Sequence, residues 1–127
     1  MTRVLLVGAG GFLGSAARYL LSGLAQGLFR TASFPAGTLA VNLSGCLVIG
    51  VLSQLAEARG AFGDPGRAFL FAGVLGGFTT FSAFGNETVN LLRDGGATLA
   101  ALNVAAQVGG GLLCVLAGRA IAHLVWG

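Results

Sequence analysis

Long apolar stretches, each interrupted by a few polar residues and glycines, occupy almost the whole chain. Short polar segments separate them at residues 30–35, 59–67 and 93–96. A bilayer is crossed by roughly 20 residues of apolar helix, and four stretches reach that length: residues 4–29, 37–57, 68–92 and 97–125. The pattern predicts an all-α membrane protein in which residues 1–127 form a single transmembrane domain of four helices.

The third apolar stretch contains an unusual segment in its middle, residues 73–84, with the sequence GVLGGFTTFSAF. It places glycines, hydroxyl side chains and spaced phenylalanines inside a segment that is otherwise apolar enough to span a membrane. Irregular backbone at membrane depth persists only where it is buried in protein or lines an aqueous path, because lipid offers unpaired backbone groups no partner. We therefore predict that the third helix is broken near its middle and that the break is functional.

The composition agrees with a membrane protein and argues against other classes. Hydrophobic residues make up 55% of the chain and charged residues 9%, with a mean hydropathy of +0.88, which leaves too little polar surface for an ordinary soluble domain. The basic residues are scattered arginines rather than a cluster, so we expect no nucleic-acid partner. Cys46 and Cys114 lie in apolar runs, outside the spacings typical of zinc sites or disulfide frameworks.

Arginines near the ends of the predicted helices are nearly balanced between the two sides of the membrane. One side has a slight excess: Arg3, Arg59, Arg67 and Arg119, against Arg30 and Arg93. Orientation follows an excess of Lys and Arg on the cytoplasmic side, so a near balance permits insertion in both orientations and an antiparallel dimer. Four short helices hardly enclose a polar route alone, and we therefore expect an oligomer.

The amino-terminal residues 4–14, VLLVGAGGFLG, are similar to the strand and glycine-rich turn of a nucleotide-sugar epimerase or reductase. That fold also needs alternating strands and an acidic residue about 20 positions further on to hold a ribose, whereas residues 15–29 contain no Asp or Glu. Gly10 and Gly14 instead have the small-xxx-small spacing of close helix packing in lipid. With no paired carboxylates, nucleophile motif or metal-ligand spacing in the sequence, we expect no enzymatic activity.

Polar side chains recur at helical spacing inside the apolar stretches. Thr38 and Asn42 are four residues apart, as are Asn103 and Gln107, and hydroxyls occupy residues 79, 80 and 82. Intramembrane polar residues usually face the bundle interior, where they bind a substrate or join helices by hydrogen bonds. For each residue alone the structural role is the simpler interpretation, but the stripes lie on three different helices.

These polar residues are mostly neutral hydrogen-bond donors, and only Arg18 is a cation well inside a span. Neutral donors suit a small anion, which must exchange its water shell without being trapped. Phe81 and Phe84 are three residues apart and share a helix face, and the edge of a phenyl ring carries positive potential. The ring edges are therefore candidate anion contacts, with ordinary packing as the alternative.

Three segments in order and spacing resemble the Fluc/CrcB family of small fluoride channels: residues 10–19 (GGFLGSAARY), residues 35–42 (PAGTLAVN), and residues 73–84 followed by Glu87. The resemblance covers all four apolar stretches. It implies an antiparallel, dual-topology homodimer in the lipid of the plasma or inner membrane. Such a protein passively exports fluoride, lowers the cytosolic fluoride level and performs no chemical reaction.

The resemblance also implies roles for individual residues, with Asn42, Phe81 and Phe84 lining the fluoride pore. It implies a structural sodium ion at the dimer centre, held by backbone carbonyl groups. Together with the polar stripes it predicts these further residues: Thr38, Thr80, Ser82 and Gln107 in the pore, Glu87 at its mouth, Arg18 and Gly77 in structural roles, and Gly76 and Thr79 as the sodium ligands.

Two positions depart from the family pattern: Ala83 stands where a threonine is common, and Gln107 where a smaller polar residue is frequent. Hydroxyls of the family's fourth helix have no counterpart at Gly111. The main alternative function is a small proton-coupled multidrug or cation exporter with Glu87 as the coupling acid, although this residue lies late in the third span. A structural membrane subunit is a third alternative, and it leaves the broken helix unexplained.

Overall fold

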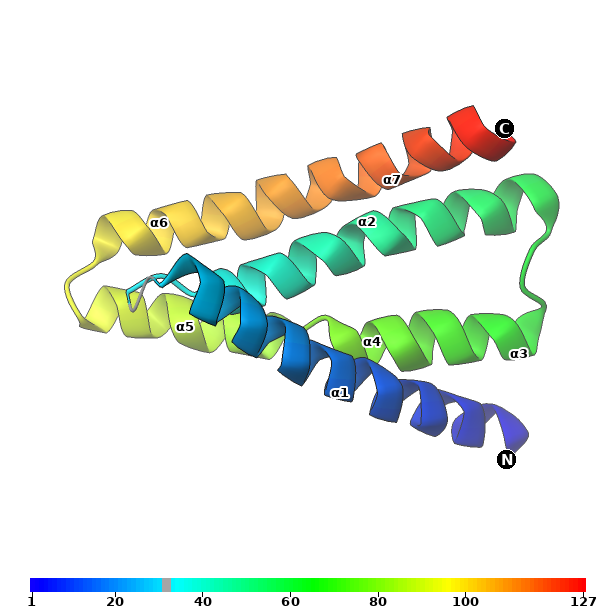
Figure 1. Ribbon diagram of the computed structural model, residues 1–127, viewed down its shortest axis with the longest axis horizontal. Coiled ribbons are helices and arrows are strands. Elements are labelled where there is room, and N and C mark those ends of the chain that lie inside the picture. The colour runs from blue at the N-terminus through cyan, green and yellow to red at the C-terminus, as the bar shows by residue number, and fades with distance from the viewer. Residues whose placement is uncertain (31–32) are drawn as a thin grey trace.

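The computed structural model describes residues 1–30 and 33–127, and within them every regular element is a helix. Four helical spans run back and forth along one long axis, and both termini lie at the same end (Figure 1). Spans 1 and 2 are the single helices α1 and α2, whereas spans 3 and 4 consist of consecutive shorter elements. Their bounds are α1 Thr2–Phe29, α2 Ala36–Arg59, α3 Asp64–Arg67, η1 Ala68–Leu75, α4 Gly76–Phe78, α5 Phe81–Arg93, α6 Ala97–Ala105, η2 Ala106–Gly110 and α7 Gly111–Trp126.

All four spans are long and apolar enough to cross a membrane, which confirms the prediction of four such helices. The prediction of a loop over residues 59–67 was partly wrong, because Asp64–Arg67 is already helical. Pro65 stands in the first turn of α3, where its missing N–H costs nothing and its fixed φ favours the helix. The predicted loop at 30–35 includes Thr31 and Ala32, which lie outside the described residues.

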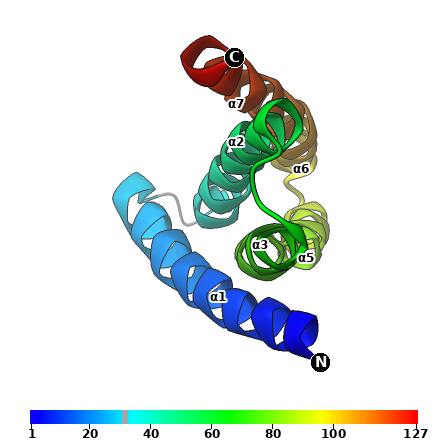
Figure 2. The same ribbon diagram turned by 90° about the vertical axis from the view of Figure 1, so that its right-hand side faces the viewer.

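The spans pack through glycines that bring backbones together. A Cβ atom built on Gly14 of α1 would overlap the carbonyl oxygen of Val74 in η1, and one on Gly118 of α7 would overlap that of Leu47 in α2. Seen from the end, α2 lies between α7 on one side and α1 and α3 on the other (Figure 2). Close backbone approach is the usual way helices associate in lipid, where apolar burial gives no driving force.

Polar contacts join the helix ends on the side of the two termini. Arg3 of α1 donates to the carboxylate of Asp64 over 2.9 Å, and Arg119 of α7 forms a two-bond ion pair with Glu57 of α2. Exposed ion pairs of this kind contribute little to the stability of the fold. They align the span ends, while the glycine contacts set the packing distances.

Span 3 is broken where the sequence predicted it. Helix α4 ends at Phe78, and two residues in extended conformation follow before α5 begins: Thr79 (φ −82°, ψ 155°) and Thr80 (φ −149°, ψ 116°). Both the N–H and the hydroxyl of Thr79 donate to the carbonyl of Leu75, over 3.0 and 2.9 Å, and so close the last turn of α4. The break therefore leaves a defined kink rather than an open end.

Spans 3 and 4 also contain wide π-helical turns, η1 just before the break and η2 in the middle of span 4. Such turns are uncommon inside α-helices and occur frequently at functional sites. Residues of both turns, among them Leu75 of η1 and Gln107 of η2, line one cavity beside the break.

Candidate functional site

The side-chain amide of Asn42 hydrogen-bonds to both backbone groups of Thr80 at the break and gives the Thr80 N–H the acceptor that it lacks there. The Thr80 N–H donates to Asn42 Oδ1 over 2.9 Å, and Asn42 Nδ2 donates to the Thr80 carbonyl over 3.0 Å. Since a backbone N–H can only donate, the atom facing it must be the amide oxygen, which fixes the orientation of the whole amide. A half-buried asparagine of α2 thus satisfies both backbone groups of Thr80 without water.

Asn42 continues this hydrogen-bond chain to span 4. Its Nδ2 also donates to Gln107 Oε1 over 2.9 Å, so the amide nitrogen of Gln107 must point away from Asn42. Gln107 is only 9% exposed, and within the described part of the chain its Nε2 has no hydrogen-bond partner. The site therefore holds a buried donor that is oriented but unused.

Thr80 also starts the next helix. Its Oγ1 accepts from the N–H of Ala83 over 3.2 Å, the usual arrangement of a threonine N-cap. The hydroxyl of Ser82, an exposed residue, lies 3.2 Å from the same oxygen. One residue thus uses its backbone to join the break to α2 and its side chain to begin α5.

The same bonds leave two carbonyl oxygens at the break without their helical donors. In an α-helix the carbonyl of residue i accepts from the N–H of residue i+4, so Gly76 would accept from Thr80 and Thr79 from Ala83. Those two N–H groups instead donate to Asn42 Oδ1 and to Thr80 Oγ1. Carbonyl oxygens released in this way are suitable ligands for a hard cation, and Gly76 is exposed on this chain.

A cavity of about 380 Å³ opens on one side of the Asn42–Thr80 pair. Its lining includes Asn42, Thr80, Gln107, Phe81 and Phe84. The two phenyl rings meet edge to face, with centroids 5.4 Å apart and planes at 65°. Phe81 is 81% exposed on this single chain, so most of its ring faces outward from the bundle.

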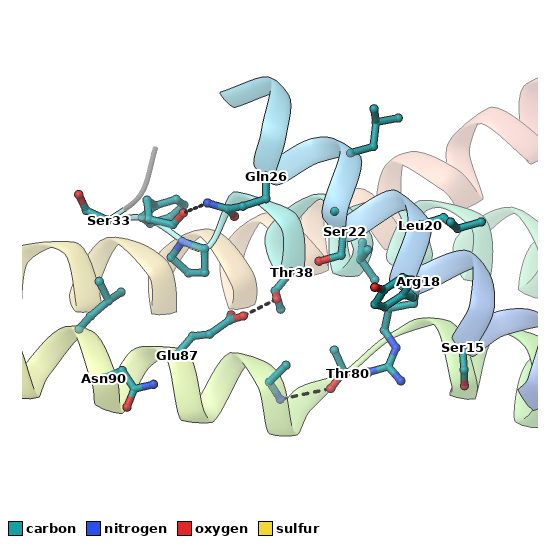
Figure 3. A pocket seen from close by; sticks show the side chains of 18 of the residues that line it. Ser15, Arg18, Leu20, Ser22, Gln26, Ser33, Thr38, Thr80, Glu87 and Asn90 are labelled. Carbon is teal, nitrogen blue, oxygen red and sulfur yellow. Dashed lines mark hydrogen bonds between the residues drawn. The ribbon is translucent and has the colours of Figure 1, made fainter. Parts of the chain in front are cut away.

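A larger cavity, about 1100 Å³, lies on the other side of the break between α1, α2 and α5. Thr38 and Glu87 point toward one another across it, and Thr38 Oγ1 donates to Glu87 Oε1 over 2.6 Å (Figure 3). Arg18 reaches into this cavity from α1, on the side of Thr80 (Figure 3). Because Thr80 lines both cavities, the break forms the partition between them.

The structure brings most of the predicted residues together around the break. The smaller cavity is lined by Asn42, Thr80, Phe81, Phe84 and Gln107, and the larger one by Thr38, Arg18 and Glu87, whereas Ser82 lines neither of them. Gly77 lies against α1, where a Cβ atom would come within 2.6 Å of the Gly11 carbonyl oxygen. Among the described residues there is no group of three His, Cys, Asp or Glu side chains suited to a metal ion, and the donors at the break are neutral.

Two hydrogen-bonded residues near the site were not assigned a role from the sequence. Asn103 Nδ2 donates to Thr88 Oγ1 over 2.9 Å, and Thr88 Oγ1 donates to the Phe84 carbonyl over 2.7 Å. Asn103 did carry a signal, as a polar residue inside an apolar run at helical spacing from Gln107. Thr88 carried none, because a threonine beside Glu87 near the end of a span is unremarkable in a sequence.

Gln26 is a third such residue, and it joins α1 to the start of α2. Its Nε2 donates to the carbonyl of Phe34 over 3.1 Å, and its Oε1 accepts from the Gly37 N–H over 3.0 Å. The amide thereby satisfies one of the N–H groups that every helix start leaves open. It holds the first turn of α2, and with it Thr38, at the edge of the larger cavity.

The chain is similar in sequence to one protein family over most of its length. The family model described as CrcB-like protein, Camphor Resistance (CrcB), matches residues 5–119. A relative from Chlorobaculum tepidum, named Fluoride-specific ion channel FluC, is 47% identical over 98% of this chain and 97% of its own length. A relative of the same name from Methylobacillus flagellatus is 47% identical over 93% and 92%. Fluoride-specific ion channel FluC 3 from Methanosarcina barkeri is 40% identical over 96% and 91%.

Proposed function

The chain belongs to the CrcB family, and on that premise we propose that it is a fluoride-selective ion channel of the cell membrane. It is a multi-pass protein that lets fluoride leave the cell passively and so lowers the cytosolic level. As a channel it performs no chemical reaction. The relatives' names support this function and give no support to a proton-coupled exporter.

The observation that carries the proposal is the hydrogen-bonded break between two cavities. Fluoride is small and strongly hydrated, so a path through the membrane must offer it donors in place of water. At the break these donors are the Gln107 amide, the Thr80 and Ser82 hydroxyls, and the ring edges of Phe81 and Phe84. Arg18 in the larger cavity adds a positive charge near the approach, and Glu87, held by Thr38, stands at that mouth of the path.

We propose that two copies assemble as an antiparallel homodimer, with both membrane orientations present. The outward-facing ring of Phe81 lies where a second copy would cover it and complete the wall of the smaller cavity. Arg3, Arg59, Arg67 and Arg119 lie toward the end of the bundle that carries the termini, and Arg30 and Arg93 toward the other. This modest difference sets little preference for one orientation.

We propose that a sodium ion binds at the centre of this dimer. The carbonyl oxygens of Gly76 and Thr79 fit such an ion, because the break has taken away their helical donors. Four oxygens from two copies would surround it, and the bound ion would supply positive charge near the anion path. The hydrogen bonds of Asn42 and Thr80 would keep these carbonyl oxygens free to face the ion.

Flux measurements on the purified protein in liposomes test the channel function. We expect rapid fluoride efflux, followed with a fluoride electrode, and chloride efflux slower by a factor of at least about 100. Phe81→Ile should abolish fluoride flux because the branched side chain has no polarised ring edge. Phe12→Ile is the matched control, since Phe12 is an exposed phenylalanine on α1 away from both cavities.

Two outcomes would contradict the channel function. One is chloride flux equal to fluoride flux in the same preparation. The other is fluoride movement only when a pH gradient is imposed, which would indicate coupling to protons and restore Glu87 as a coupling acid.

A further inference from the structure

Helix α5 carries Phe81 and Phe84, yet apolar packing does little to hold it in place. None of its residues from Phe81 to Arg93 is buried, and two extended residues separate it from α4. A helix joined through such a link can turn about its own axis unless other contacts prevent it. The direction in which the two rings point therefore depends on the hydrogen bonds that α5 makes with its neighbours.

Helix α2 makes three of these bonds, two between Asn42 and Thr80 and one from Thr38 to Glu87. All three hold the face of α5 that is turned toward α2. A fourth bond comes from span 4, where Asn103 Nδ2 donates to Thr88 Oγ1. Contacts from two different helices are what is needed to prevent rotation as well as displacement.

The geometry around Thr88 fixes which atom of Asn103 faces it. Thr88 Oγ1 lies 2.7 Å from the carbonyl oxygen of Phe84, and two oxygens approach that closely only with a hydrogen between them. The hydroxyl hydrogen is thus committed to Phe84, and Thr88 Oγ1 can only accept from its other neighbour. The atom of Asn103 at 2.9 Å must be Nδ2, and the Asn103 amide cannot be flipped without losing the bond.

Asn103 is fully buried, with 0% of its surface exposed, and within the described part of the chain its Oδ1 has no partner. An unpaired buried acceptor disfavours folding, whereas a leucine would fill a similar volume without one. Stability alone therefore does not account for an asparagine here. Its one bond, which leads through Thr88 to the backbone of Phe84, does.

We propose that Asn103 and Thr88 are positioning residues of the pore. By holding α5 from the side of span 4, they fix its rotation so that the rings of Phe84 and Phe81 face the smaller cavity. The inference rests on the proposed fluoride pathway for its functional consequence. The orientation of Phe84 can be measured independently of flux.

The test uses the full-length protein with three substitutions: Asn103→Leu, Thr88→Val and Thr88→Ser. Loss of the bond should lower fluoride flux by about tenfold in the first two variants, while Thr88→Ser, which keeps the hydroxyl, should conduct like the original chain. The Asn103→Leu and Thr88→Val double variant should be no worse than either single one, because both remove the same bond. Thr98→Val on the exposed surface of α6 is the matched control.

Two further measurements separate positioning from structural damage. Asn103→Leu should unfold at a temperature no lower than the original chain, since it removes an unpaired acceptor. A 4-fluorophenylalanine introduced at position 84 should change its ¹⁹F NMR shift in Asn103→Leu and in Thr88→Val but not in Thr98→Val.

An unchanged ¹⁹F shift with flux within about twofold of the original in both variants would overturn the proposal. So would a loss of flux that Thr88→Ser shares, since the hydroxyl would then be irrelevant. If the original chain conducts no fluoride but the shift still moves, the channel function fails and the positioning of Phe84 stands.

Discussion

The two halves of the broken third span are held in the bundle by different means. The first half, from α3 to α4, packs backbone against backbone on α1, through Gly10 and Gly14 on one side and Gly73 and Gly77 on the other. The second half, α5, has no buried residue and is tied to its neighbours by side-chain hydrogen bonds. The first half is positioned by close backbone packing and the second by side-chain hydrogen bonds.

This difference matters because the two kinds of contact fail differently. Backbone contact through glycine tolerates no added atom, since the packed surfaces cannot yield. A side-chain hydrogen bond contributes only about 0.5–1.5 kcal/mol net to stability. Its loss leaves the fold intact but changes the direction in which α5 and its side chains point. We therefore expect substitutions in the first half to affect folding and those around α5 to affect conduction.

The largest effect should follow from Gly14→Ala, which disturbs the packing of α1 against the first half of span 3. Its Cβ would overlap the carbonyl of Val74, and overpacking of this kind costs about 1–3 kcal/mol and occasionally more. We expect a large loss of folded protein, measured by yield in detergent and by thermal unfolding. Gly8→Ala is the control, because open space surrounds a Cβ there. Equal stability of the two variants would show that α1 is not held by backbone contact.

Asn42→Asp removes hydrogen bonds at the start of the second half of span 3 and should leave the fold intact. A carboxylate cannot donate to the Thr80 carbonyl or to Gln107 Oε1, and it brings negative charge to an anion path. The loss of two hydrogen bonds corresponds to a fall in fluoride flux of about 100-fold. Asn86→Asp, at an exposed position of α5, should conduct normally. Flux through Asn42→Asp close to that of the original chain would remove Asn42 from the path.

Thr38→Val should have the smallest effect of the three. It removes the hydrogen bond to Glu87 Oε1 and leaves the other contacts of α5 in place. The loss of one bond corresponds to a decrease in fluoride flux of about three- to tenfold, with Thr38→Ser as the variant that restores it. A Thr38→Ser protein as slow as Thr38→Val would mean that side-chain volume, rather than the hydroxyl, matters at this position.

The sequence predicted the first half of span 3, from α3 to α4, better than the second half, α5. Glycines and hydroxyls in the middle of an apolar stretch have few explanations other than a broken helix, and the four spans follow from length and composition. The start of span 3 was placed too late, because Asp64 and Pro65 are typical of turns and of first helical turns alike. Asn103 of α6 and Gln107 of η2 are both buried, as expected of polar residues inside an apolar stretch.

What the sequence could not supply is which atoms meet across helices. Asn42 and Gln107 are 65 positions apart, and the bond between them depends on how α2 and span 4 are rotated about their axes. The link between Asn103 and Thr88 depends on rotation in the same way, and nothing in the local pattern around Thr88 indicates it. The predicted sodium ligands Gly76 and Thr79 rested on resemblance, and the structure adds the reason that their carbonyls are available.

The side-chain amide of Asn42 hydrogen-bonds to both the N–H and the carbonyl of one residue, Thr80. An open carbonyl at that depth would repel a passing anion, and an open N–H would hold it too long. Because both are occupied, the backbone of Thr80 neither repels nor retains the ion, and the donors that face the route beside it are side-chain hydrogens, which can turn away. A channel that works in this way would combine low retention with high selectivity, and its throughput would depend on side-chain rotation instead of backbone movement.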